Sequence, residues 1–330
     1  MKAAVMSEQR VRRPARHSHR MGTDTNRRRL GIALALIVAF MAAEVAAGFL
    51  ASSLALLSDA GHMLTDAGAL MLSLLAMRWA SRPPRGAMTY GLKRTEILAA
   101  QVNGLTLLLI AVVVTVEAVR RLISPPEVEG WIVVGVALAG VVVNLIATWQ
   151  ISGADRRSLN IEGSFQHIVT DLYAFAGTAV AGIVILTTGF VRADAIASLI
   201  VVGLMVRAGV KLLKASGRVF LEAAPEGLDP GEIVGALRAH QGVTNVHDLH
   251  VWTITSGFPA LSAHVLVRPG DDCHAVRRDL EEILRDRFMI EHTTLQVDHD
   301  EAERLLNIGM AERAPEADLS PSRTEDPAAG

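Results

Sequence analysis

The chain has 330 residues, which at about 150 residues per domain predicts two domains. Hydrophobic residues make up 51% of the sequence and charged residues 20%, below the roughly 25% of a soluble globular domain, so the composition argues against a wholly soluble protein. The 32 basic residues nearly balance the 34 acidic ones, which argues against a nucleic-acid binder, and Cys273 is the only cysteine, which excludes an intrachain disulfide.

The hydrophobic residues are concentrated in six segments of about the length that spans a bilayer. Three of them contain no charged residue: 97–116, 131–154 and 172–191. Three others carry isolated ionisable residues: 30–52 with Glu44, 60–79 with His62 and Asp66, and 193–213 with Asp194 and Arg207. The sequence therefore predicts a basic segment at 1–29 and a six-helix transmembrane domain at 30–222. A signal peptide is not expected, because residues 1–29 are too polar.

Basic residues are unequally divided between the two sides of these segments. The rich segments are 1–29, 78–94, 156–157 and 211–218, whereas the opposite connections hold only Arg120, Arg121 and Arg192. Because basic loops stay in the cytoplasm, we expect both termini there, in a multi-pass protein of the bacterial inner membrane.

The pattern changes after residue 222. An amphipathic helix is predicted at 229–240 and a second at 273–288, with alternating strands at 243–253, 260–267 and 293–297. Ser256 and Gly257 mark a turn between the first two strands. The fold class is thus six transmembrane helices followed by a small cytoplasmic α+β domain (αββαβ, ferredoxin-like) at 223–305. The composition of residues 306–330 is typical of a disordered tail.

A histidine followed four residues later by an aspartate occurs twice, once within the second predicted span and once in the fifth, directly before its charge-free segment. The first pair is His62 and Asp66, and the second is His167 and Asp171. Residues four apart lie on one helix face, so two such helices facing each other offer two nitrogens and two oxygens. That is a tetrahedral set suited to Zn²⁺. A single copy of the motif would be weak evidence, and the alternative for the pair is a buried hydrogen-bond network.

Four motifs in this order resemble the cation diffusion facilitator family, and its bacterial zinc-exporting branch in particular. They are Asp59-Ala-Gly-His-Met-Leu-Thr-Asp66, Tyr90-Gly-Leu-Lys-Arg-Thr-Glu-Ile97, the His167/Asp171 pair and His247-Asp-Leu-His-Val-Trp252, within 27–305. The resemblance implies a homodimeric transporter that exchanges a divalent cation for protons. It names His62, Asp66, His167 and Asp171 as the transport ligands, and His62 favours zinc, with cadmium or cobalt as secondary ions.

The ligand chemistry suggests the mechanism. Imidazole binds metal only when it is neutral, so metal ions and protons compete for the same histidine. A site that faces an acidic exterior and then the cytoplasm would exchange zinc for protons by alternating access. The sequence lacks a phosphate-binding loop of the Gly-x₄-Gly-Lys-Ser/Thr type, and no prosthetic group is expected.

Further residues carry weaker expectations. Asp59 either attracts cations or caps its helix, and Asn144 is either a partner of the site or a contact between helices. By family position, Arg94 and Glu222 resemble a charge pair that joins the third span to the end of the sixth, and the alternative is two charges facing water. Family members bind regulatory zinc in the cytoplasmic domain, and the residues in the matching positions are His247, His264, His274 and Asp298. Gln296 stands where a histidine would complete a two-metal site.

Two other function classes compete with transport. An intramembrane zinc-dependent enzyme would use the same ligands, but the sequence has no His-Glu-x-x-His motif, and a catalytic zinc usually keeps three protein ligands rather than four. A membrane metal sensor would need an output domain, and the C-terminal segment is small and poor in motifs. A non-enzymatic transporter whose partners are metal ions, protons and the bilayer, without nucleic acid, is therefore the prediction.

Overall fold

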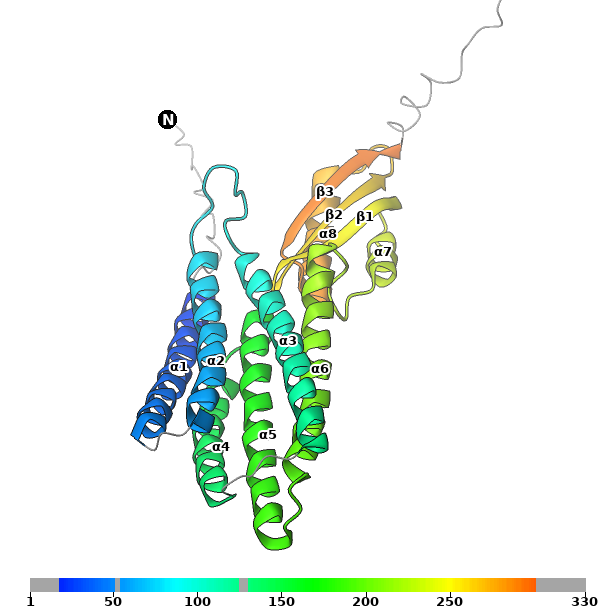
Figure 1. Ribbon diagram of the computed structural model, residues 1–330. Helices are drawn as coiled ribbons and strands as arrows, with labels where there is room; N and C mark the ends of the chain where they lie inside the picture. Colours follow the sequence, from blue (N-terminus) through cyan, green and yellow to red (C-terminus); the bar gives the residue numbers. More distant parts are fainter. Residues whose placement is uncertain (1–17, 51–53, 125–129, 301–330) are drawn as a thin grey trace, which may run out of the picture. The chain divides into compact units, whose positions relative to one another are not determined.

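The computed structural model describes residues 18–50, 54–124 and 130–300, without the side chains of 18–23, 48, 50, 54–62, 130 and 132–133. The residues up to Pro225, together with Trp252–Pro259, form one compact unit, and Glu226–Val251 with the residues from Ala260 onward form a second. The first unit holds six long helices that run side by side (Figure 1). They are α1 (Ser18–Leu50), α2 (Leu54–Ala80), α3 (Thr95–Ile123), α4 (Gly130–Ser152), α5 (Leu159–Thr188) and α6 (Ala193–Phe220).

The lengths and compositions of these helices suit a bilayer. Among the described residues, helices α1, α3, α4, α5 and α6 each contain a stretch that is long and apolar enough to cross a membrane. Helix α2 adds 27 residues at the position of the expected second span. Large apolar side chains such as Leu109, Val112 and Ile200 are exposed on the outer faces, as lipid contact requires. The predicted fold class is thus confirmed.

Four of the helices share one apolar core. Leu30 and Ile37 of α1 pack with Leu70 of α2, Ile151 of α4 and Ile168 of α5, and all five side chains are at most 1% exposed. Because these residues recur at helical spacing, each helix turns one apolar stripe towards the others. Helices α1, α2, α4 and α5 therefore form a four-helix group.

Helices α3 and α6 form a second, closely packed pair. A Cβ added to Gly209 of α6 would lie 3.0 Å from the carbonyl oxygen of Gly104 of α3 and 2.9 Å from the side chain of Leu108. Two helix backbones approach this closely only where small residues meet, which is a common device in membranes. Leu107 and Met205 continue the contact as part of a separate apolar cluster.

Basic side chains lie at the helix ends in two sets. Arg27 donates to the carbonyl oxygen of Met77 at 2.7 Å, and Arg29 donates to that of Gln150 at 3.1 Å, near the ends of α2 and α4. At the opposite end of the bundle, Arg192 donates to the carbonyl oxygen of Leu122 at 2.9 Å. Cations at helix C-termini interact favourably with the helix dipole.

After α6 the chain has the predicted αββαβ order, and all of it except Trp252–Pro259 belongs to the second unit. Its elements are α7 (Pro230–Arg238), β1 (Val243–Thr255), β2 (Phe258–Val267), α8 (Cys273–Phe288) and β3 (His292–His299). The strands lie in the order β1-β2-β3, with β3 parallel to β2. Gly257 has a φ of +72° and forms the predicted turn with Ser256. Leu237, Leu280 and Leu284 are fully buried and form part of the unit's core.

Candidate metal centre

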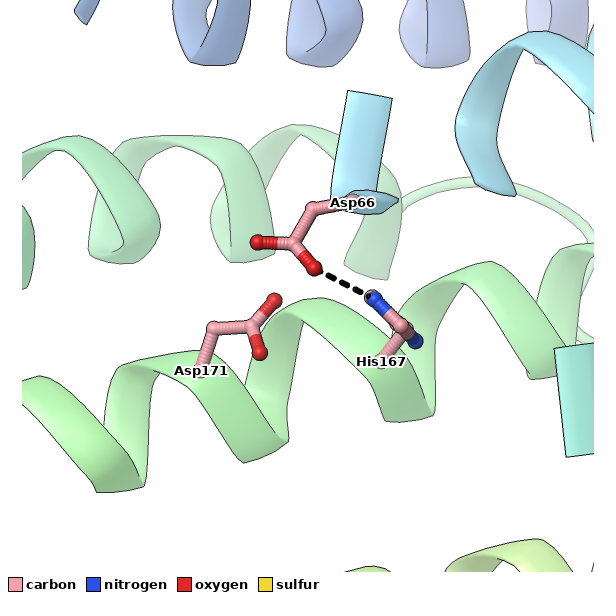
Figure 2. Close-up of side chains that lie close together, drawn as sticks. All are labelled: Asp66, His167 and Asp171. Atoms are coloured by element: carbon pink, nitrogen blue, oxygen red, sulfur yellow. Dashed lines mark hydrogen bonds and ion pairs between the residues drawn. The ribbon is translucent and has the colours of Figure 1, made fainter. Parts of the chain in front are cut away.

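The motif residues of α2 and α5 meet inside the first unit. Nε2 of His167 lies 2.8 Å from Oδ1 of Asp66, which joins the two helices (Figure 2). Asp171 follows His167 by one turn of α5. One ligand atom from each of the three residues lies within 4.8 Å of the others. A group of three such atoms this close together could hold a metal ion.

These ionisable side chains lie within membrane-spanning helices, where burying them costs free energy. Their presence there indicates a function. The side chains of His167 and Asp66 are only 2% and 13% exposed. Ionisable residues in a transmembrane segment cost about 2.5–3.5 kcal/mol each on insertion scales, and they mark ion pathways. Two carboxylates beside an imidazole provide the charge and the nitrogen and oxygen donors that a divalent metal needs.

Comparisons with known proteins decide the family. Residues 30–221 match the model of the cation efflux transmembrane domain, and residues 225–300 match that of the cation efflux protein cytoplasmic domain. The chain belongs to the cation efflux family. The resemblance seen in the motifs is thereby confirmed, and the multi-pass membrane architecture with it.

Several relatives of this cation efflux protein are similar along nearly their whole length. The Cadmium, cobalt and zinc/H(+)-K(+) antiporter of Bacillus subtilis (strain 168) is 38% identical over 299 residues, which cover 87% of this chain and 94% of the relative. The Zinc transporter ZitB of Escherichia coli (strain K12) is 38% identical, covering 86% and 92%. The Metal cation efflux system protein CzcD of Cupriavidus metallidurans is 40% identical, covering 85% and 88%.

Solved structures also match this chain, and one of them covers the C-terminal part. It is described as the metal-bound C-terminal domain of the CzcD transporter from Cuprividus metallidurans. It is 35% identical, covers 21% of this chain and 97% of its own, and has a TM-score of 0.21.

The fourth expected ligand, His62, lies in α2 one turn before Asp66. Its side chain, like that of Asp59, is outside the described residues. Asp66, His167 and Asp171 are thus the three members of the predicted set that the described structure brings together.

A buried polar cluster, which the sequence analysis did not identify, lies beside this centre. Ser73 of α2 is its hub: the hydroxyl of Ser164 donates to Oγ of Ser73 at 2.8 Å, and Nδ2 of Asn103 donates to the same atom at 3.2 Å. Nδ2 of Asn160 donates to the backbone oxygen of Ser73 at 2.9 Å. All four side chains belong to residues at most 1% exposed. The sequence does contain a signal for part of this cluster. Asn160, Ser164, His167 and Asp171 follow one another at intervals of 4, 3 and 4 residues, which places them on one face of α5.

Three other expected residues of the first unit are not among the three ligands that meet at the metal centre. Nη2 of Arg94 lies 3.1 Å from Oε1 of Glu222, so the two charges form an ion pair, with side chains 40% and 62% exposed. A pair this exposed contributes about 0–1 kcal/mol to stability. Asn144 is buried and donates to the carbonyl oxygen of Gly140 in its own helix. Their functional roles stay predictions.

In the second unit, two of the four predicted regulatory ligands are neighbours. The rings of His247 and His264 are 5.3 Å apart, and Asp248 lies 3.8 Å from Nε2 of His264. Asp298 instead accepts a hydrogen bond from Gln296 at 2.8 Å, and His274 is the second residue of α8. Within the described part of the chain, these residues do not form a group of three ligands like that of α2 and α5. The regulatory site stays a prediction.

Proposed function

We propose that this protein exports Zn²⁺ from the cytoplasm in exchange for protons, with Asp66, His167 and Asp171 as metal ligands and His62 as the fourth. The observation that carries the proposal is the group of three ligands, buried or partly buried, that α2 and α5 bring together. Nitrogen and carboxylate donors in a four-ligand set favour zinc, and the names of the relatives, a zinc transporter and a cadmium, cobalt and zinc antiporter, support zinc first with cadmium and cobalt as secondary ions.

Proton coupling follows from competition at the imidazoles. Zinc binds the neutral ring, so binding from the cytoplasm releases protons, and protons from an acidic exterior displace the metal. The buried Asp66 carboxylate beside His167 provides a partner for the protonated ring after zinc has left. One site therefore carries both substrates in turn, which is the requirement for exchange.

Direction and topology rest on charge. The end of the bundle at which α2 ends and α3 and α5 begin carries the basic segments, so we place it, both termini and the second unit in the cytoplasm of a bacterial inner membrane. We further propose a homodimer, in line with the match to the family's cytoplasmic domain.

The test is zinc flux into proteoliposomes under an imposed pH gradient, with the purified full chain. We expect gradient-dependent zinc movement in the wild type and none above background in Asp171→Ala. The matched control is Asp155→Asn, an exposed carboxylate in the connection between α4 and α5, which is expected to transport like the wild type.

Two other results of the flux experiment would contradict the proposal, each in a different part. Protein that binds zinc but shows no flux would overturn transport and return the sensor and the zinc-dependent enzyme to consideration. Flux that survives Asp171→Ala would retain the transporter and refute the assignment of its site.

A further inference from the structure

The polar cluster of Ser73, Asn103, Asn160 and Ser164 contains two buried acceptors whose partners are missing from the described protein. Oδ1 of Asn103 and Oδ1 of Asn160 are both inaccessible to solvent, and neither accepts a hydrogen bond from a described group. A buried acceptor without a donor is destabilising, and in native proteins such atoms are usually satisfied by bound water. Two of them in one cluster indicate a ligand that donates hydrogen bonds.

The cluster and the metal centre lie one to two turns apart on the same two helices, α2 and α5. Asn160 and Ser164 precede His167 by two turns and one turn of α5, and Ser73 follows Asp66 by two turns of α2, so the cluster lies about 5–10 Å from the centre along the helix axes. The displacement on both helices is towards the end where α2 ends and α5 begins. The cluster is therefore nearer than the metal centre to that end of the bundle.

The chemistry of the cluster differs from that of the centre. Its donors and acceptors are hydroxyl and amide groups, without a carboxylate or an imidazole, so it has no charged ligand with which to hold bare zinc. Neutral amide oxygens are instead good acceptors for the polarised water molecules around a divalent cation. A path conducts when binding is favourable enough to admit the ion and weak enough to release it.

We propose that Ser73, Asn103, Asn160 and Ser164 form a second, uncharged site on the metal path, which binds a hydrated divalent cation through its water ligands before the ion reaches Asp66, His167 and Asp171. The inference rests on the proposed function. It assigns the two orphan amide oxygens a role in the rate at which zinc reaches the centre rather than in how tightly the centre holds it.

The experiment separates these two quantities. Zinc association and dissociation are followed by stopped-flow fluorescence on the purified full chain, and the equilibrium Kd is measured by calorimetry. In Asn103→Leu and Asn160→Leu, which keep side-chain size and remove the amide, we expect both rate constants to fall about tenfold with an unchanged Kd, as for the loss of one hydrogen bond from the barrier. The matched control is Thr115→Val on α3, whose hydroxyl bonds within its own helix.

The outcomes are distinct. Wild-type rates in both variants overturn the second site, as does a weaker Kd at unchanged association rate, which is the result expected of a purely structural cluster. Wild-type protein that binds no zinc overturns the proposed function instead. Should either leucine variant unfold, as thermal unfolding would reveal, Asn103→Ala and Ser164→Ala also remove polar groups of the cluster, without the apolar branches that leucine adds.

Discussion

Asp66 contacts His167 through Oδ1, and this oxygen is also the atom that we expect to bind zinc. On the proposed mechanism, this carboxylate has two partners at different stages of transport, the metal and the imidazole. A side chain with this double role needs its negative charge for the first partner but only a hydrogen-bond acceptor for the second.

The substitution Asp66→Asn separates these roles. The amide keeps an acceptor for His167, so the fold should be retained, but the loss of the anionic ligand should raise the Kd for zinc more than about tenfold, since even the loss of an outer partner costs 10–100-fold in affinity. Calorimetry with the purified protein measures this. Asp155→Asn should bind zinc like the wild type, and an unchanged Kd in Asp66→Asn would remove this residue from the ligand set.

Whether a residue of the site could be predicted from the sequence depended on the type of its side chain. Ionisable residues in membrane helices are rare, and His167 and Asp171 repeat the spacing of His62 and Asp66, so the sequence alone indicated them. Asn103 and Ser73 were not, because serine and asparagine in membrane helices commonly join helices, and only the packing of α2, α3 and α5 brings these two together.

At the scale of helices, the fifth span begins earlier than the sequence predicts, because its first turns carry polar residues. The charge-free segment 172–191 suggested where the fifth span lies, whereas α5 begins at Leu159. Its first turns are polar but buried, with Asn160 and Ser164 turned into the cluster around Ser73, so hydropathy alone places the boundary too late. The sequence also could not show which helices pair, because that depends on small contacts such as Gly104 against Gly209.

The contact between α3 and α6 yields a prediction with an internal control. In Gly209→Ala the new methyl would lie 3.0 Å from the Gly104 carbonyl oxygen, so the helices must separate, at a cost of about 1–3 kcal/mol. Gly203→Ala on the same helix meets nothing within 4 Å and should stabilise α6 by about 0.5–1 kcal/mol through helix propensity. Thermal unfolding in detergent compares the two, and equal melting temperatures would contradict the close approach.

The start of α8 gives a prediction about pH. Asp272 accepts hydrogen bonds from the backbone N–H groups of Ala275 and His274, at 3.1 and 3.0 Å, and the bond from Ala275 is the main cause that lowers the pKa of this carboxyl below its ordinary 3.8. Because the folded pKa is depressed, the stabilisation is fully present above 3.8 and is lost as the pH falls through the folded value. At neutral pH the cap is therefore intact.

Removing this cap should loosen one helix. Asp272→Ala should speed amide hydrogen exchange in the first turn of α8 at neutral pH, whereas Asp272→Asn should retain protection, since asparagine is an equally good N-cap. Hydrogen exchange followed by mass spectrometry on the full chain measures the difference. Glu282→Ala, an exposed site on the same helix, is the control. Equal exchange in Asp272→Ala and the wild type would argue against the cap.

At the scale of the whole molecule, the distribution of basic residues predicts which end of the bundle faces the cytoplasm. The end of the bundle that holds Arg27, Arg29 and Arg94 is rich in cations, whereas the opposite end holds Arg120, Arg121 and Arg192, and one of these, Arg121, pairs with Asp194 at 3.1 Å. Positive loops resist translocation, so the first end should face the cytoplasm. After an even number of spans, the chain from Glu226 onward must then lie on that same side.

The single cysteine makes this orientation measurable without engineering. Cys273 lies at the start of α8 and is partly exposed, so a membrane-impermeant maleimide should label the protein in inside-out vesicles and not in right-side-out vesicles. In a Cys273→Ser background, Gly189→Cys, in the exposed connection between α5 and α6, should show the opposite pattern. Labelling of Cys273 from outside the cell would show that the orientation is the reverse of the one predicted. Zinc would then reach Asn160 before His167 from the opposite side of the membrane.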